Sequence, residues 1–423
     1  MTFLQRIGLR TSKSRETAHS RAKLSIAIVC IAPLRDSAIL GGTYSAVLGE
    51  SLRREGLSVE LWSRKSSETQ VELDVPVRQV WRPGPFAWLD VLKAVIRIRP
   101  RIVHLQHYFF LFGNGAGGEL STMLLVLSLA LVRRGAVVTL HDVPGREQIT
   151  PQYVRLHKYN YPAWVALAGI TALLYLLGTF AREIVVHNEL FAGRLARFGV
   201  DPRKISVIPH MPLPSNPVER TSARKMLGLP DGERVVLFFG YATGYKGIEL
   251  LLSAFEILEE RGSNVRLLFG AGVHPKMGAT HGYAEYYSGL ETKARSIGLV
   301  DFIGFINSAN LDTYISAADL GILPYVEYHG ASGPLYYYLS HERPVLVSTS
   351  IARHTPGFEC GAFAASPDAI ADAISRFFED GAFRESIQRE SAEVRRTLFS
   401  DAYLVLTRAV YDKALGSSVS GVT

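Results

Sequence analysis

The stretch RVVLFFGYATGYKGIELLLSAFEIL, residues 234–258, decides the fold class. Its first seven residues form a β-branched and aromatic run, as found in strands that are covered on both faces. A glycine-rich loop follows, and the apolar residues after Gly247 recur with the spacing of an amphipathic helix. A strand, a loop and a helix in this order predict one unit of a parallel α/β sheet.

Units of this kind recur along most of the chain and predict an α/β protein of two doubly wound, Rossmann-like domains that face a cleft. Open parallel sheets bind ligands outside the carboxyl ends of their strands, so the predicted strand ends are where we look for a site. The predicted strands cover residues 24–32, 57–62, 101–107, 136–142, 183–188 and 205–210 in the first half, and 234–240, 265–270, 300–305, 320–325 and 344–348 in the second.

The segment 211–233 is rich in proline and polar residues and shows no strand pattern, so we interpret it as an interdomain linker. It separates a predicted domain at 24–210 from a second one at 234–398. The polar segments 1–23 and 416–423 are predicted to be disordered tails.

Composition fits a globular protein and excludes several other classes. The 423 residues are 48% hydrophobic and 20% charged, which argues against global disorder. The net charge of +7 comes largely from residues 1–23, which hold six basic residues and one acidic residue. No basic stripe with interleaved aromatics follows, so no nucleic-acid partner is expected. Two cysteines exclude a disulfide framework; Cys30 and Cys360 lie among apolar residues and are predicted to be buried thiols of a reducing compartment.

An uncharged run of 23 residues lies between Lys158 and Arg182. It is long enough to span a bilayer, but prolines and glycines interrupt it and a predicted strand follows at once. Three interpretations stay open: a spanning helix, a helix at the membrane surface, and a buried helix. A second apolar helix ends at Arg133 and Arg134, and with Trp164 these arginines would suit an interfacial docking surface on the acceptor side.

Two glycine clusters precede predicted helices. Gly41 and Gly42 end the loop after the first strand, where backbone amides could approach a phosphate. The run from Gly113 to Gly118, with Asp142 downstream, fits most of a dinucleotide-binding fingerprint, although five residues separate it from its strand. A nicotinamide site or a loop at the rim of the cleft would both account for the second cluster.

Histidines end several strands of the first domain. His141 and Asp142 close the strand 136–142, and His187 and His210 end the next two. A histidine at this edge could transfer a proton or bind a substrate hydroxyl, or it could only cap the sheet end. No carboxylate stands at metal-ligand spacing from a histidine, so no metal site is expected.

The second domain carries two features suited to a phosphate. Lys246 stands at a loop–helix junction beside free helix amides. Ser332, Gly333 and Pro334 open another predicted helix, with serine suited to the N-cap and proline to the first turn. Both features follow strands of one sheet and would face one ligand, such as a diphosphate.

The ordered set of motifs resembles a retaining glycosyltransferase of the GT-B fold, of glycosyltransferase family 4. The resemblance rests on the GG loop at Gly41, VVTLHD, EIVVHN followed by KISVIPH, FFGYATGYKGIELL, VDFIGF with LDTYISAADLGILPY, and SG followed by RPVLVS, and it spans about residues 24–350. It implies an acceptor-binding first domain, a second domain that binds a nucleotide sugar, and a last helix at 399–415 that crosses back to the first domain.

The resemblance also implies a role for individual residues. Lys246 would neutralise the departing diphosphate and His141 would lie near the transferred sugar, as the catalytic residues. The implied reaction is front-face hexosyl transfer to an acceptor hydroxyl, with the leaving phosphate as base and without metal or cofactor. UDP- or GDP-linked sugars would be donors. The implied donor-binding residues are Gly41, Gly42, Gly240, Thr243, Lys246, His329, Ser332 and Gly333.

This chain departs from the family pattern at three positions. Thr243 replaces an arginine three residues before the lysine, and His329 and Tyr337 replace a pair of glutamates. An active enzyme of surface polysaccharide or glycolipid synthesis is the favoured interpretation, with a glycan or lipid-linked acceptor. It would be cytoplasmic, at the inner face of the plasma membrane if the apolar helices dock there. A catalytically silent binding or scaffold subunit, and more remotely a nicotinamide-dependent oxidoreductase, are the alternatives.

Overall fold

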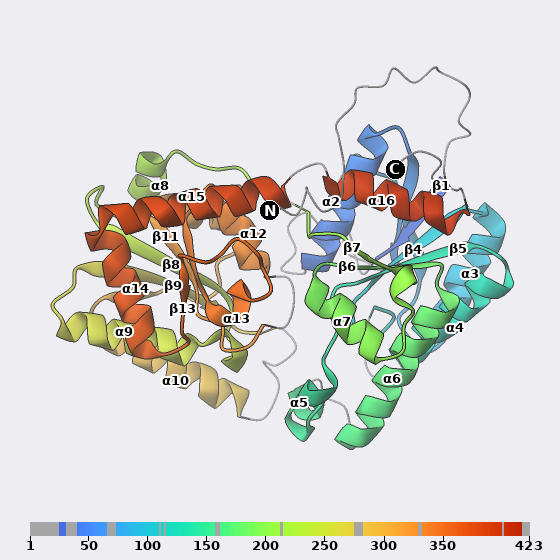
Figure 1. The fold of residues 1–423 in the computed structure, drawn as a ribbon, viewed down its shortest axis with the longest axis horizontal. Coiled ribbons are helices and arrows are strands. Elements are labelled where there is room, and N and C mark those ends of the chain that lie inside the picture. Colours follow the sequence, from blue (N-terminus) through green and yellow to red (C-terminus); the bar gives the residue numbers. More distant parts are fainter. Residues whose placement is uncertain are drawn as a thin grey trace.

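The computed structural model describes residues 25–30, 40–65, 73–109, 111–113, 116–156, 161–211, 215–274, 282–328, 332–399 and 402–416. The predicted tail 1–23, nearly all of the tail 416–423, and His329 lie outside these residues. Two α/β domains stand side by side, each with a sheet between helices (Figure 1). The prediction of two doubly wound domains is confirmed.

The first domain is built on a seven-stranded parallel sheet in the order β3-β2-β1-β4-β5-β6-β7. Its strands are β1 (Ser25–Val29), β2 (Ser58–Arg64), β3 (Val77–Trp81), β4 (Ile102–His107), β5 (Gly135–Leu140), β6 (Glu183–Val186) and β7 (Ile205–Val207). Its helices are α2 (Leu40–Arg54), α3 (Ala87–Ile98), α4 (Ala116–Leu131), α5 (Pro151–Leu156), α6 (Ala163–Phe180) and α7 (Glu189–Arg197), with short 3-10 turns at η1 (Arg146–Gln148) and η2 (Pro202–Lys204).

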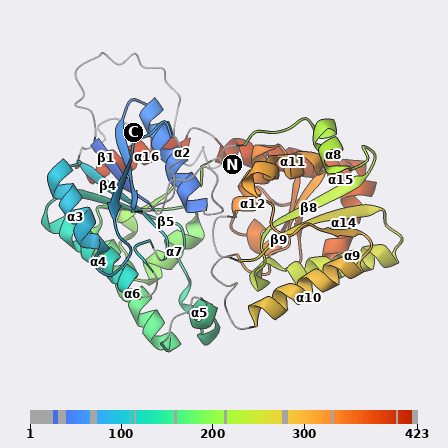
Figure 2. The same cartoon turned by 180° about the vertical axis from the view of Figure 1, so that it is seen from behind.

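The second domain repeats this plan with six parallel strands in the order β10-β9-β8-β11-β12-β13 (Figure 2). Its strands are β8 (Arg234–Tyr241), β9 (Val265–Gly272), β10 (Val300–Phe302), β11 (Leu320–Leu323), β12 (Val345–Ser348) and β13 (Ala362–Phe363). Its helices are α8 (Arg220–Leu227), the 3-10 turn η3 (Gly244–Lys246), α9 (Ile248–Glu260), α10 (Tyr283–Ser296), α11 (Ser308–Ala317), α12 (Gly333–Ser340), α13 (Thr349–Ala352), α14 (Pro367–Glu379) and α15 (Gly381–Leu398).

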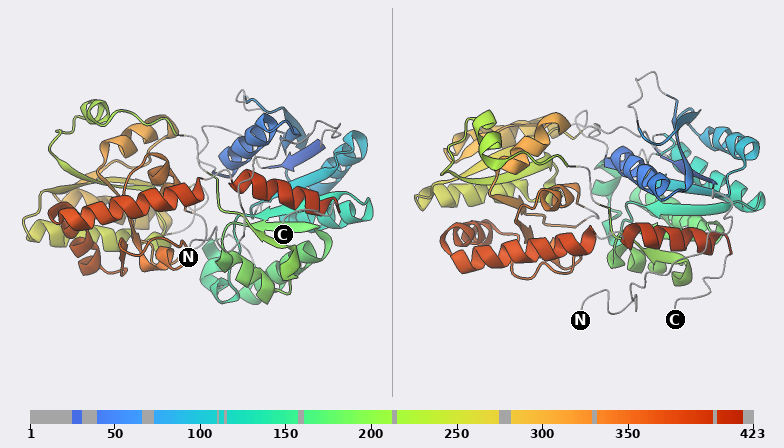
Figure 3. Two further views of the ribbon diagram at one scale, coloured as in Figure 1. Left: turned by 45° about the horizontal axis from the view of Figure 1, so that its top comes forward. Right: turned by 90° about the horizontal axis from the view of Figure 1, so that it is seen from above.

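The last helix, α16 (Ala402–Ala414), leaves the second domain and packs on the first (Figure 3). Tyr403, Val410 and Tyr411 are buried in a core cluster that includes Ile26 and Leu48 of the first domain. The Tyr403 hydroxyl donates to Ser51 Oγ at 2.9 Å, and the Tyr411 hydroxyl lies 2.8 Å from His104 Nδ1. The first domain therefore takes part of its core from the end of the chain.

The segment predicted as a linker contains a helix that the sequence analysis did not anticipate. α8 is anchored by Arg224, whose side chain is fully buried and donates to the carbonyl oxygens of Ala317, Pro230, Asp231 and Glu233. Its Nη2 also donates to Asp319 Oδ2 at 2.9 Å. These bonds hold α8 against the second domain.

The two cysteines differ from each other. Cys30, at the end of β1, is buried as predicted, and burial raises the pKa of its thiol to about 12. Cys360 is exposed, so the prediction that it is buried was wrong. It lies just before the two-residue strand β13, where its backbone N–H donates to Glu390 Oε1 at 2.7 Å and little packs over its side chain.

Candidate active site in the interdomain cleft

Lys246 lies buried at the carboxyl edge of the second sheet, in the turn η3 that follows β8. Gly240, with φ +139°, lets the chain leave the strand, and a Cβ there would lie 2.8 Å from Lys246 Nζ. Among the described residues no carboxylate lies within ion-pair distance of that ammonium group, and burial lowers the pKa of Lys246 to about 8. A buried cation without a carboxylate partner is suited to an anionic ligand.

The N-terminus of α12 meets this lysine at the same edge. Ser332 caps the helix, with its Oγ accepting from the Leu335 N–H and lying 3.2 Å from the Tyr325 hydroxyl. The Cβ position on Gly240 that touches Lys246 Nζ also lies 3.8 Å from Pro334 Cγ. The structure therefore brings Lys246 and the Ser332–Gly333–Pro334 turn together, as the sequence analysis expected, with helix amides beside a buried cation.

The histidines that end the strands of the first domain form one hydrogen-bonded group. His187 Nδ1–H donates to the Ile208 carbonyl oxygen at 3.0 Å, and His187 Nε2 lies 3.0 Å from His141 Nδ1. His141 Nε2 lies 2.8 Å from Gln106 Oε1, and the Tyr108 ring stacks on His141 at 4.1 Å. Both ring nitrogens of His141 are thus engaged within the first domain.

Tyr44 of α2 connects His141 and His187 to a third histidine, His210. Its ring meets those of His141, His187 and His210 edge to face, with centroid distances of 4.8, 5.4 and 4.7 Å. The His210 ring in turn lies 4.7 Å from that of Tyr336 on α12. Aromatic contacts thus run from the first domain to the helix that carries the candidate phosphate site.

Polar contacts also cross between the domains near Asp142. Gln148 Nε2 donates to Glu327 Oε1, from η1 to the loop after β11. Arg194 of α7 donates to the Val143 carbonyl oxygen at 2.8 Å. Burial raises the pKa of Asp142 to about 6, while the positive charge of Arg194 opposes the shift. The cleft therefore holds ionisable groups from both domains.

Two glycine features differ between the sequence prediction and the structure. Gly41 and Gly42 lie within the first turn of α2, which begins at Leu40, and not in a loop before the helix as predicted. The cluster at Gly113 has a packing explanation, because a Cβ on Gly118 would lie 2.3 Å from the Gly113 carbonyl oxygen. That contact accounts for Gly118, and the φ of +139° accounts for Gly113, so two glycines of the apparent dinucleotide fingerprint are explained without a ligand.

Two of the positions that depart from the family pattern, Thr243 and Tyr337, lie in the described residues, and neither carries a charged side chain. Thr243 is buried beside Lys246 as the N-cap of η3. Tyr337 is half-buried on α12, where its ring meets that of Phe239 at 6.1 Å. Glu342 pairs with Arg395 at 3.2 Å beyond the C-terminal end of α12, away from Lys246.

The remaining predicted residues lie on α6 or just after α4, two outer helices that pack against each other. One face of α6 packs in the core through Ile170, Leu173 and Leu177, whereas Trp164 is 72% exposed. α6 is the one described helix long and apolar enough to cross a membrane. Arg133 and Arg134 follow the C-terminal end of α4, whereas Trp164 lies in the first turn of α6. Both helices run antiparallel to the strands between them, so arginines and Trp164 lie at opposite ends of the helix pair.

Sequence reasoning missed the aromatic residues of the cleft. Tyr44, Tyr108, Tyr325 and Tyr336 all contact predicted site residues or their neighbours. Tyr108 and Tyr325 stand within two residues of the end of a strand, and Tyr44 and Tyr336 lie in the first two turns of a helix. Tyrosine at these positions has no motif of its own. Their position next to predicted site residues is the signal that could have found them.

Two family models match the chain, and together they cover this cleft. The "Glycosyl transferase 4-like domain" model matches residues 41–210, and the "Glycosyl transferases group 1" model matches residues 233–380. With the two parallel-sheet domains, these matches identify a glycosyltransferase of the GT-B type. Each of its two domains is similar to the family that the matching model describes.

Individual relatives are distant. An uncharacterized glycosyltransferase of Methanocaldococcus jannaschii is 29% identical over 177 residues, which are 40% of this chain and 42% of that protein. A D-inositol 3-phosphate glycosyltransferase of Xylanimonas cellulosilytica is 25% identical over 315 residues, 66% of this chain and 68% of that one. The first match thus spans less than half the length of the archaeal protein.

Solved structures share the fold over nearly the whole chain. Anabaena HepE in complex with UDP and glucose superposes with a TM-score of 0.66 at 14% identity, covering 94% of this chain and 100% of that one. Sucrose-phosphate synthase from Thermosynechococcus elongatus gives 0.67 at 19% identity, covering 93% and 99%. At these identities the likeness establishes the fold.

Acid should destabilise the protein through the buried histidines. Burial lowers the pKa of His187 to about 4 and those of His104 and His210 to about 3. Between these values and about 6.5 the unfolded chain binds more protons than the folded one, so the free energy of unfolding falls as pH falls, by up to about 1.4 kcal/mol per pH unit for each histidine. Asp142, with its raised pKa, acts in the opposite direction but is a single group.

Urea unfolding at pH 7, 6 and 5 measures this loss. We expect a lower midpoint at each step and a shallower dependence in His187→Gln. An unfolding free energy that stays constant from pH 7 to pH 5 would show that the buried histidines do not have lowered pKa values in the folded protein.

Proposed function

We propose that the protein transfers a sugar from a nucleotide-sugar donor to a hydroxyl group of an acceptor, with retention of the anomeric configuration and without a metal. The observation that carries the proposal is the convergence of Lys246, which has no carboxylate partner, with the N-terminus of α12 at one edge of the second sheet. The relatives support it, since HepE was solved with UDP and glucose. Donors linked to UDP or GDP are the first candidates.

In this proposal the second domain binds the diphosphate and the first binds the acceptor. Lys246 and the Gly333 end of α12 stabilise the negative charge that builds on the leaving phosphate, which is the main catalytic contribution. The acceptor hydroxyl attacks the front face of the sugar and passes its proton to that phosphate. Gly41 and Gly42, in the first turn of α2, would approach the donor from the other domain.

His141 has a positioning role in this proposal. Its two ring nitrogens are engaged by His187 and Gln106, and burial lowers its pKa well below the ordinary value. A neutral ring held in this way shapes the wall beside the sugar and presents its backbone to it. The leaving phosphate, not His141, then acts as the base.

The direct test is unfolding of the purified protein with UDP, GDP, ADP, their sugar conjugates and NAD in parallel. A ligand at one hundred times its dissociation constant adds about 2.7 kcal/mol of stability. We expect protection by one nucleoside diphosphate and its sugar conjugates. Protection by none of them, with no sugar transfer, would favour the silent binding subunit that Thr243 suggests, and protection by NAD alone would favour an oxidoreductase.

We further propose that the acceptor is a glycan or a lipid-linked glycan of a surface polysaccharide or glycolipid, and that the protein works on the cytoplasmic face of the membrane. The exposed apolar residues of α4 and α6 support this, because Trp164 and Tyr175 are exposed on α6 and Leu131 is 75% exposed at the end of α4. Arg133 follows directly and is exposed as well. Exposed aromatic and apolar side chains on a helix surface can bind a membrane interface. Arg133 lies at the other end of the helix pair from Trp164, so the arginine would add attraction to anionic lipid beside Leu131 and not beside Trp164.

Replacing Trp164 with alanine should weaken binding to vesicles that contain anionic lipid about tenfold, corresponding to ~1.4 kcal/mol of apolar burial. Sedimentation with the vesicles measures it. Met226→Ala is the matched control, since Met226 is 69% exposed on α8 of the other domain. Equal sedimentation of the two variants would show that α6 is not part of the docking surface.

A further inference from the structure

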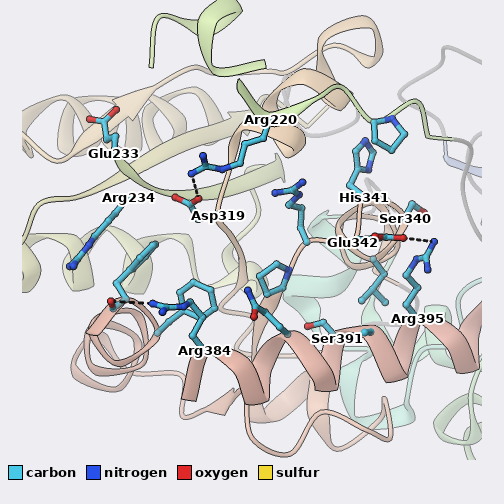
Figure 4. Close-up of a pocket in the computed structure, with 18 of the residues that line it drawn as sticks. Arg220, Glu233, Arg234, Asp319, Ser340, His341, Glu342, Arg384, Ser391 and Arg395 are labelled. Carbon is cyan, nitrogen blue, oxygen red and sulfur yellow. Dashed lines mark hydrogen bonds and ion pairs between the residues drawn. The ribbon is translucent and has the colours of Figure 1, made fainter. Parts of the chain in front are cut away.

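A large cavity lies in the second domain, at the opposite edge of the sheet from Lys246. It has a volume of about 1210 Å³ (Figure 4). Arg234, where β8 begins, lines it, and so do Asp319 and Pro344, which directly precede β11 and β12. Lys246 follows the other end of β8. Eight residues of strand, about 23 Å long, separate the two places.

Arginine dominates the charged lining of this cavity. Figure 4 shows Arg220 reaching it from the start of α8, and Arg384 and Arg395 reaching it from α15. The lining contains six arginines and four carboxylates, and these are Arg220, Arg234, Arg343, Arg384, Arg395, Arg396, Asp231, Glu233, Asp319 and Glu342. No lysine lines it.

Most of the carboxylates are already paired. Asp319 accepts from Arg220 at 2.6 Å and from Arg224 at 2.9 Å. Glu342 pairs with Arg395 at 3.2 Å. Glu233 pairs at 2.5 Å with Arg266, which does not line the cavity. The acidic groups therefore do not balance the remaining arginines.

Three arginines have no carboxylate within ion-pair distance among the described residues: Arg234, Arg343 and Arg384. The Arg234 guanidinium lies over the Phe378 ring at 5.8 Å. Arg384 Nη1 donates to the Phe378 carbonyl oxygen at 3.5 Å. Arg343 Nη1 donates to the Ala318 carbonyl oxygen at 3.3 Å, and its buried Nε has no hydrogen-bond partner.

These three cations come from separate elements, the start of β8, the loop before β12, and α15. Holding guanidinium groups without carboxylate partners around one cavity costs free energy, and burial, with the positive charges of Arg220 and Arg224, lowers the pKa of Arg343 despite the nearby carboxylates. An anion in the cavity would relieve this cost. Guanidinium groups are suited to phosphate because their N–H donors match its oxygens in pairs.

We propose that this cavity is a second ligand site, which binds a phosphate-bearing small molecule through Arg234, Arg343 and Arg384. The site is distinct from the donor site and does not depend on the proposed transfer reaction. The shared chemistry is a phosphate group, supplied either by a soluble phosphorylated metabolite or by a lipid headgroup. The second source would require the opening to meet a membrane surface.

Calorimetric titration with inorganic pyrophosphate tests the proposal in the Lys246→Ala background, where the donor site lacks its cation. Glucose 6-phosphate and vesicles containing phosphatidic acid are titrated in parallel to separate the two sources. We expect saturable binding of pyrophosphate, weakened about tenfold or more by Arg384→Gln. Arg261→Gln is the matched control, because Arg261 is exposed on the surface beyond α9 and outside the cavity.

A second variant keeps the test valid if Arg384→Gln fails to fold. Gln388 is exposed at the cavity, one helical turn after Arg384 on α15, so Gln388→Glu adds a negative charge without removing a contact. It should weaken pyrophosphate binding severalfold. The proposal is wrong if the folded Lys246→Ala protein binds none of the three probes at millimolar concentration, or if Gln388→Glu binds pyrophosphate as tightly as Arg261→Gln does.

Discussion

Lys246→Ala is expected to lower the kcat for sugar transfer by about 10²–10³-fold and to remove the stabilisation that nucleoside diphosphates give. The magnitude follows that of single donors that stabilise a developing anion. No other cationic side chain stands in the β8–α9 loop, since Thr243 occupies the place where the family has arginine. The remaining stabilisation would come from the N-terminus of α12 alone.

In the absence of ligand, Lys246→Ala should not destabilise the protein. Lys246 is buried with a lowered pKa and without a carboxylate partner in the described residues, so the folded state disfavours its charge. Urea unfolding without ligand should therefore give an equal or higher free energy of unfolding than in the unchanged protein. Lys225→Ala, on the exposed side of α8, is the control for loss of one positive charge. Transfer and nucleotide protection that survive in Lys246→Ala would show that Lys246 is not the diphosphate ligand.

Arg224→Leu is expected to lower the free energy of unfolding by about 3–5 kcal/mol, the usual cost of breaking a buried ion pair on one side. The substitution leaves the carbonyl oxygens of Ala317, Pro230 and Asp231 without their donor. It also removes one of the two arginines that pair with Asp319. Urea unfolding followed by circular dichroism measures the loss.

Arg220→Leu is the matched control for this prediction. Arg220 contacts the same carboxylate, but its side chain is 37% exposed, whereas that of Arg224 is 0% exposed. Water can replace part of what Arg220 supplies, so we expect a loss of about 1 kcal/mol or less. Equal losses in the two variants would show that burial does not determine the contribution of Arg224.

The strands of both sheets could largely be predicted because their apolar runs are long and β-branched. Two strands were missed. β3 has the sequence VRQVW, whose polar residues suit an edge strand and hide the apolar pattern, and β13 has only two residues. α8 was missed because proline and charged residues surround it, and its position depends on the burial of Arg224 rather than on a regular apolar face.

The proximity of Lys246 to the start of α12 could be predicted because both follow strands of one parallel sheet. The aromatic contacts of the cleft could not. Tyr44 and His210 come from distant parts of the first domain, and Tyr336 comes from the second, so their contact depends on how the domains meet. The arginine cavity could not be predicted either, because its lining comes from four separate segments of the sequence that only the folded second domain brings together.

The return of α16 to the first domain has a consequence for how the protein is made. On the ribosome, the strands β1 to β7 are complete long before residues 402–414 are synthesised. Until then the first sheet lacks the cover that Tyr403, Val410 and Tyr411 provide over Ile26 and Ile28. The second domain has all its strands and helices α8–α15 by residue 398. The core of the domain that is translated first is therefore complete only after the last helix has been synthesised.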